Sequence, residues 1–128
     1  MTKIEQAQAL RDCTAPHYNC CQSVFIPFAA ERGLSQESAA AVAAHFGSGM
    51  RRGAACGATT GALMALGILG KGEDAAKEFI AAFKEKNTEL DCAPLLELGE
   101  KQGIAKKAYC DSLVALAVSL VEELAAKD

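Results

Sequence analysis

The chain has no tryptophan, few aromatic residues and no long apolar run. Aromatic residues make up 5% of its 128 residues. The longest apolar run, from Gly61 to Leu69, is about half of the ~20 residues that a membrane-spanning helix needs. We therefore expect no membrane span. The segment from Met1 to Arg11 is polar and lacks the charged-then-apolar pattern of a signal peptide, so we also expect a cytoplasmic protein.

Positive charge is scarce as well. The chain has 13 lysines and arginines against 16 aspartates and glutamates, which gives a formal net charge of −3 at pH 7. The basic residues are scattered apart from two short pairs, Arg51-Arg52 and Lys106-Lys107. A nucleic-acid partner needs a concentrated basic face. The composition therefore argues against nucleic acid as a partner, and such pairs are typical of a solvated surface.

Alanine, leucine, glutamate and lysine are abundant, and these residues favour helices. Start and stop signals predict helices over about 4–12, 19–32, 36–46, 56–69, 73–87, 95–98 and 108–125. A glycine-rich turn, from Gly47 to Gly53, precedes the central helix. We therefore expect one all-α domain over residues 1–128, folded as a compact bundle of five to seven helices.

Two glycines, Gly57 and Gly61, lie on one side of the expected central helix. Each glycine in a helix interior costs about 1 kcal/mol relative to alanine. Two such glycines in one helix predict that the backbone of this helix lies in close contact with another helix or with a cofactor. The same face is compatible with a homodimer.

Six cysteines are the main candidates for chemistry, and none forms a CxxC pair, which excludes zinc-ribbon and thioredoxin motifs. In a reducing compartment we do not expect a structural disulfide framework. Cys20, Cys56, Cys92 and Cys110 lie at or near the starts of predicted helices, where free N–H groups and the helix dipole favour thiolates. Four such thiolates can gather at one end of the bundle and bind a metal or an iron–sulfur centre. The alternative is that each cysteine is a small, buried apolar residue of the core.

Several polar residues near these cysteines are candidates for contact with a sulfur or with negative charge: His17, Arg51, Arg52, Thr59 and Thr60. Thr60 is four residues after Cys56 and therefore shares its helix face. An exposed position in a turn is the alternative for His17. No nucleophile–base pair stands out, and the glycine-rich turn lacks the strand and the lysine of a P-loop. We therefore assign no catalytic residue.

Three segments and two later cysteines stand in a distinctive order. They are Asn19-Cys20-Cys21-Gln22-Ser23-Val24, Phe46-Gly47-Ser48-Gly49-Met50, Cys56-Gly57-Ala58-Thr59-Thr60-Gly61-Ala62-Leu63-Met64-Ala65-Leu66-Gly67, and then Cys92 and Cys110. From about Asn19 to Leu124 the chain resembles the C_GCAxxG_C_C family of small redox-active proteins. The resemblance implies that the family's four cysteines fall on Cys20, Cys56, Cys92 and Cys110. A similar domain ends the split-Soret cytochrome c proteins, where an iron–sulfur cluster is associated with it, and this implies a cluster as cofactor.

The chain departs from the family pattern at two cysteines. Cys21 stands where the family commonly has a small residue such as alanine, and Cys13 has no counterpart. Cys20 and Cys21 point about 100° apart on a helix, so we expect Cys21 to be a core residue. The expected function is electron transfer or redox sensing with an unknown redox partner protein. Two alternatives stay open: a metal-free thiol–disulfide protein, and a structural zinc site in a partner-binding helical module.

Overall fold

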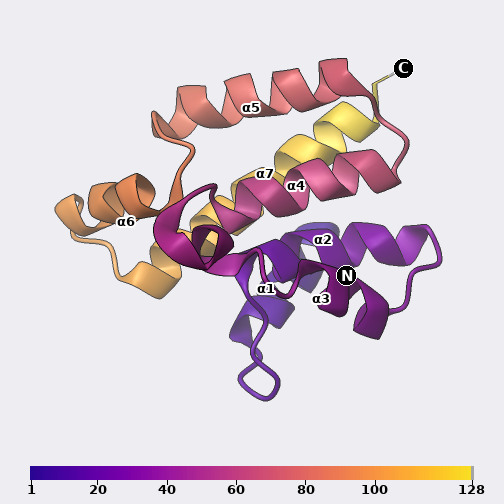
Figure 1. Cartoon of the computed structure of the whole chain (residues 1–128), viewed down its shortest axis with the longest axis horizontal. Coiled ribbons are helices and arrows are strands. Elements are labelled where there is room, and N and C mark those ends of the chain that lie inside the picture. Colours follow the sequence, from indigo (N-terminus) through magenta and orange to yellow (C-terminus); the bar gives the residue numbers. More distant parts are fainter. Residues whose placement is uncertain (128) are drawn as a thin grey trace.

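A computed structural model describes residues 1–127, which fold into helices joined by short turns (Figure 1). The α-helices are α1 (Lys3–Asp12), α2 (Cys20–Glu31), α3 (Gln36–Ala43), α4 (Gly57–Ile68), α5 (Glu73–Asn87), α6 (Cys92–Lys101) and α7 (Lys106–Ala125), and a π-helical turn, η1 (Gly49–Gly53), precedes α4. Residues 1–127 contain no β-strand, which confirms the all-α class. With η1 counted, this range holds eight helices, one more than expected, because the glycine-rich turn itself closes as a helical turn.

Side-chain caps fix where the first two helices begin. The Thr2 hydroxyl accepts a hydrogen bond from the Glu5 N–H, and the Glu5 carboxylate accepts one from the Thr2 N–H. Asn19 and Gln22 form the same capping box at α2, and both of its hydrogen bonds are 2.8 Å long. The start predicted at Asn19 is therefore confirmed. The third helix, in contrast, ends at Ala43, three residues short of its expected end at residue 46.

α2 packs against most of the other helices: it contacts α1, α3, α4 and α7. The helix expected at the centre of the bundle, α4, is one of these neighbours. α4 and α7 lie beside each other, with α2 on one side of them and α5 on the other (Figure 1). α6 lies at one end of the bundle and packs against α7 and η1. Within residues 1–127, no helix has both the length and the apolar character required to cross a membrane.

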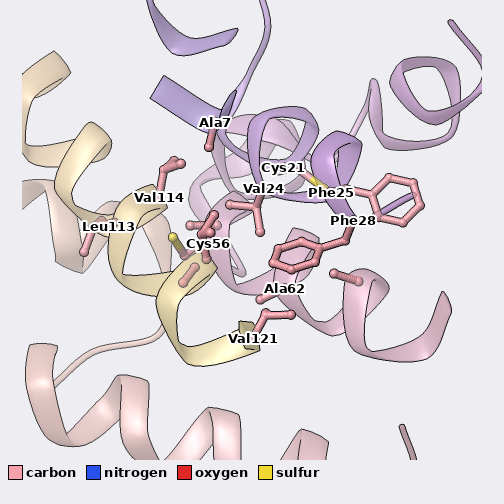
Figure 2. Packing of buried hydrophobic residues seen from close by; sticks show 14 of the residues in the cluster. Ala7, Cys21, Val24, Phe25, Phe28, Cys56, Ala62, Leu113, Val114 and Val121 are labelled. Atoms are coloured by element: carbon pink, nitrogen blue, oxygen red, sulfur yellow. The ribbon is translucent and has the colours of Figure 1, made fainter. Parts of the chain in front are cut away.

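Small, branched and aromatic side chains fill the core between α2, α4 and α7. Figure 2 shows Val24 and Phe28 of α2, Ala62 of α4 and Val121 of α7 gathered in this core, and all four are buried. Cys56 belongs to the same cluster and is 4% exposed. The hydrophobic core therefore includes one of the four cysteines.

Gly57 and Gly61 lie where α4 touches α2. A Cβ atom on Gly61 would be 2.6 Å from the carbonyl oxygen of Cys21, and one on Gly57 would be 3.2 Å from the Cβ atom of Cys20. The expected close contact with another helix is therefore confirmed. This face of α4 is covered by α2 within the chain, and the homodimer stays a prediction.

Candidate functional site

The cysteines at the helix starts line a single cavity. Cys20 and Cys92 are the first residues of α2 and α6, Cys56 directly precedes α4, and Cys110 lies in the second turn of α7. All four line a cavity of about 510 Å³. That these cysteines bind a metal or a cluster stays a prediction. The fold brings all four to the same cavity.

A short antiparallel pairing joins the segment that contains Cys56 to the segment that contains Cys92. The N–H of Cys56 donates to the carbonyl oxygen of Leu90 at 3.0 Å, and the N–H of Cys92 donates to that of Ala54 at 2.7 Å. These two bonds enclose an isolated bridge between Ala55 and Asp91. The segments that lead into α4 and α6 are therefore joined directly before each helix begins.

The loop at η1 has a strained backbone that lies against this pairing. Ser48, Gly49, Met50 and Arg51 are consecutive residues with positive φ, between 52° and 64°. A left-handed backbone costs a non-glycine residue about 1 kcal/mol or more. A Cβ atom on Gly49 would lie 2.7 Å from the Cβ atom of Cys92. Strain of this kind clusters at functional sites, and here it places Arg51 at the cavity.

The thiols of Cys20 and Cys110 influence each other's protonation more than any other group does. Interaction with the Cys20 thiol, with help from the charges of Arg11 and Lys106, lowers the pKa of Cys110 to about 7. Interaction with the Cys110 thiol, together with burial, raises the pKa of Cys20 far above its usual range. Near neutral pH the pair therefore shares one proton, and Cys110 carries the larger part of the negative charge.

The other two thiols of the cavity are harder to ionise than free cysteine. Burial raises the pKa of Cys56, although the N–H groups of Ala58 and Thr59 and the Thr59 hydroxyl lower it in part. Burial also raises the pKa of Cys92, and the neighbouring thiols of Cys56 and Cys110 add to the effect. Helix starts were expected to favour thiolates, but desolvation outweighs the helix ends at these two positions.

The cavity is positively charged. Four basic side chains line it: Arg11, Arg51, Arg52 and Lys106. Among the residues described, no acidic side chain lines it. The Nε atom of Arg11 lies 2.8 Å from Oδ1 of Asp111, whereas the other three form no ion pair within residues 1–127. In a protein of net charge −3, this pocket is therefore suited to thiolates or to another negatively charged group.

The polar candidates divide into those at the cavity and those away from it. His17 and Arg51 line the cavity, and Thr60 does not. The Thr60 hydroxyl donates to the carbonyl oxygen of Cys56 at 3.2 Å, so it is engaged with the backbone and not with a sulfur. Thr59 is the threonine whose hydroxyl helps to lower the pKa of Cys56, and this hydroxyl is buried without a hydrogen-bond partner. A buried hydroxyl without a partner is costly, so a small shift that let it donate to the Cys56 sulfur would be favourable.

The two remaining cysteines lie away from the cavity lining. Cys21 is fully buried, and its Sγ lies 3.5 Å from Sδ of Met64, which confirms the expected core position. Burial raises the pKa of Cys21 to about 12. Cys13 directly follows α1 and is partly exposed. It is therefore a suitable control position for experiments on the cavity cysteines.

Sequence reasoning missed Arg11 and assigned Lys106 to the solvated surface. Lys106 lies four residues before Cys110 on the same helix, and this spacing was a usable signal. Arg11 lies on α1, and none of the four cavity cysteines is on that helix. No local pattern therefore connects Arg11 to the site.

The sulfurs surround the cavity instead of meeting at one point. Within the described part of the chain, no three histidine, cysteine, aspartate or glutamate side chains are grouped closely enough to hold one metal ion. The four thiols nevertheless line the same space.

Comparison with known proteins identifies one related group. Residues 18–124 match the family described as "Putative redox-active protein (C_GCAxxG_C_C)". No curated protein and no solved structure matches the chain. The match includes all four cavity cysteines and leaves out Arg11.

Proposed function

The chain belongs to the C_GCAxxG_C_C family of redox-active proteins, and on that basis we propose that its four-cysteine cavity holds an iron–sulfur cluster. In this proposal the protein transfers or senses electrons, and the cluster is bound by the thiolates of Cys20, Cys56, Cys92 and Cys110. One observation carries the proposal: four thiols, each at or near the start of a different helix, line one cavity.

The chemistry of the cavity suits such a group. Iron–sulfur clusters are held by cysteine thiolates, and four of them bring negative charge that the protein must offset. The four basic side chains of the cavity supply the opposite charge. Binding requires deprotonated sulfurs. Burial raises the pKa of Cys56 and of Cys92, and the pKa of Cys20 is raised as well, so these three thiols release protons on binding. Cys110, with its pKa lowered to about 7, is partly ionised beforehand.

The size of the cavity favours a cluster over a single zinc ion. Its volume of about 510 Å³ is far above the ~30 Å³ that one water molecule occupies in the liquid. A structural zinc ion needs four sulfurs at about 2.3 Å from one point. In a cluster the thiolates bind different iron atoms, so their sulfurs lie further apart than around one zinc ion. The walls of the cavity therefore need not move inward for all four sulfurs to bind.

The chain's own residues would position the sulfurs and adjust the charge around them. A bound cluster supplies one-electron chemistry. The pairing before α4 and α6 joins the segments that carry Cys56 and Cys92, and the Thr59 hydroxyl is available to the Cys56 sulfur. Leu95 and Leu113 provide buried apolar walls that limit the access of water.

Reconstitution under anaerobic conditions tests the proposal. Metal-free protein is incubated with ferrous iron and sulfide, and bound iron, bound sulfide and visible absorption are then measured. Wild type and Cys13→Ser are expected to take up iron and sulfide, and Cys56→Ser is expected to lose most of this uptake. Equal uptake by the two variants would refute the assignment. Zinc without iron in the protein as purified would indicate a structural zinc site instead.

The interacting thiols of Cys20 and Cys110, which line the same cavity, favour a second function, metal-free thiol–disulfide chemistry. The Cys110 thiolate attacks a substrate disulfide, forms a mixed disulfide and releases one substrate thiolate. Cys20, after losing its proton, then attacks the Cys110 sulfur and releases the second substrate thiolate. The substrate disulfide is thereby reduced, and the protein dithiol is oxidised to a Cys20–Cys110 disulfide.

Peptide mapping of metal-free protein after exposure to glutathione disulfide tests this second function. We expect a Cys20–Cys110 bridge, with Cys13 still a free thiol. An unchanged count of free thiols would rule the function out.

The same residues support a proposal for the location and for the partner. Six free cysteines suit a reducing compartment, and we propose the cytoplasm. Arg51, Arg52 and Lys106 are exposed at the cavity, so a redox partner with an acidic surface fits there. Association with such a partner is expected to weaken as ionic strength rises.

A further inference from the structure

Arg11 differs from the other basic residues that line the cavity. Its side chain is 10% exposed, and its Nε donates to Oδ1 of Asp111 at 2.8 Å. Arg51, Arg52 and Lys106 are exposed. A charge fixed in a partly buried position acts on its neighbours more strongly than a mobile charge in water, because solvent and salt screen it less.

A network between α1 and α7 holds Arg11 in place. Besides Arg11, the carboxylate of Asp111 accepts hydrogen bonds from Gln8 at 3.1 Å and from Lys107 at 2.8 Å. Lys107 also pairs with Asp12 at 2.7 Å. Since Asp111 directly follows a cavity cysteine in the chain, this network fixes the guanidinium beside the cavity.

We propose that Arg11 sets the reduction potential of the cysteine cavity, as a fixed positive charge that stabilises the more negative, reduced form of the bound centre. This inference rests on the proposed function. One electron from a one-electron donor protein makes the centre more negative by one charge, and the chain forms and breaks no bond. Arg11 is a positioned charge and not a ligand, and Asp111 holds it.

Matched variants separate this role from a structural one. Arg11→Gln and Lys107→Gln each remove one positive charge from the same network, but only Arg11 lines the cavity. Arg11→Lys retains the charge. The readout is the midpoint potential of the reconstituted protein, measured by titration against redox dyes and followed by visible absorption.

The expected effect follows from the interaction of two charges. For charges about 10 Å apart at an effective dielectric constant of about 20, losing one changes an equilibrium roughly tenfold. We therefore expect Arg11→Gln to lower the equilibrium constant for one-electron reduction about tenfold, which is a shift of about 59 mV to more negative potential. Lys107→Gln is expected to change it far less, and Arg11→Lys to stay close to wild type.

The outcomes distinguish this inference from the proposed function. Equal potentials for wild type and Arg11→Gln, at equal iron content, would overturn the role of Arg11 and leave the cluster in place. Failure of wild type to take up iron and sulfide would refute the proposed function itself. If Arg11→Gln does not fold, Arg11→Met removes the same charge while keeping an apolar stem, and the same shift is expected.

Discussion

Replacing Gly61 with alanine should force α2 away from α4 and destabilise the protein. The added Cβ would lie 2.6 Å from the carbonyl oxygen of Cys21 and 3.1 Å from the Cβ of Val24. Carbon–oxygen contacts in proteins are about 3.3 Å or longer, so the two backbones would have to separate by about 0.7 Å. Overpacking of this kind costs about 1–3 kcal/mol, and alanine regains about 1 kcal/mol of helix propensity. We expect the free energy of unfolding to fall, by up to about 2 kcal/mol.

Gly67→Ala is the matched control, because it is the same substitution in the same helix. No atom lies within 4 Å of a Cβ at Gly67, and the position is exposed. Only helix propensity changes there, so we expect a gain of about 0.5–1 kcal/mol. Guanidinium chloride unfolding of reduced, metal-free protein, followed by circular dichroism, measures both variants. If Gly61→Ala is as stable as Gly67→Ala, the explanation of the glycine contact is wrong.

Two further predictions concern the cap of α2 and the ion-pair network. Asn19→Ala removes the capping box with Gln22, so the free energy of unfolding should fall by about 1 kcal/mol in denaturant titrations, and an unchanged value would contradict the role of the cap. Burial works against the charge of Asp111, but hydrogen bonds from Lys107 and Arg11 outweigh it and lower its pKa in the folded state. The unfolded chain therefore binds a proton first as pH falls, and the stability that Asp111 contributes at neutral pH is lost below about pH 5. Asp111→Asn should make the fall of Tm in acid shallower, and an equally steep fall would refute this account.

The helices were predictable because their signals are local. Asn19 and the glycine-rich turn mark boundaries in the sequence itself, and the alanine-rich segments between such marks have few other stable conformations. The count was one too low because a glycine-rich turn does not reveal that it closes as a helical turn. The contact made by Gly57 and Gly61 was also predictable, since two costly glycines on one helix face require a close neighbour.

Only those features of the site that lie within one helix or one sequence motif could be predicted. The choice of Thr60 followed helix-face spacing, but Cys56 directly precedes α4. When a residue directly precedes a helix, the residue three positions later lies beside its side chain. For Cys56 that residue is Thr59. Arg11 and the pairing of segments 54–56 and 90–92 depend on contacts between distant parts of the chain. Helical periodicity carries no information about such contacts.

The most direct test of the central claim is the iron and acid-labile sulfide content of protein purified anaerobically, measured together with its visible spectrum. The proposal predicts iron and sulfide bound in comparable amounts, broad visible absorption, and the loss of both in Cys56→Ser but not in Cys13→Ser. Colourless protein without iron or sulfide, in which the cysteines of the cavity react as free thiols or form a Cys20–Cys110 disulfide, would contradict it.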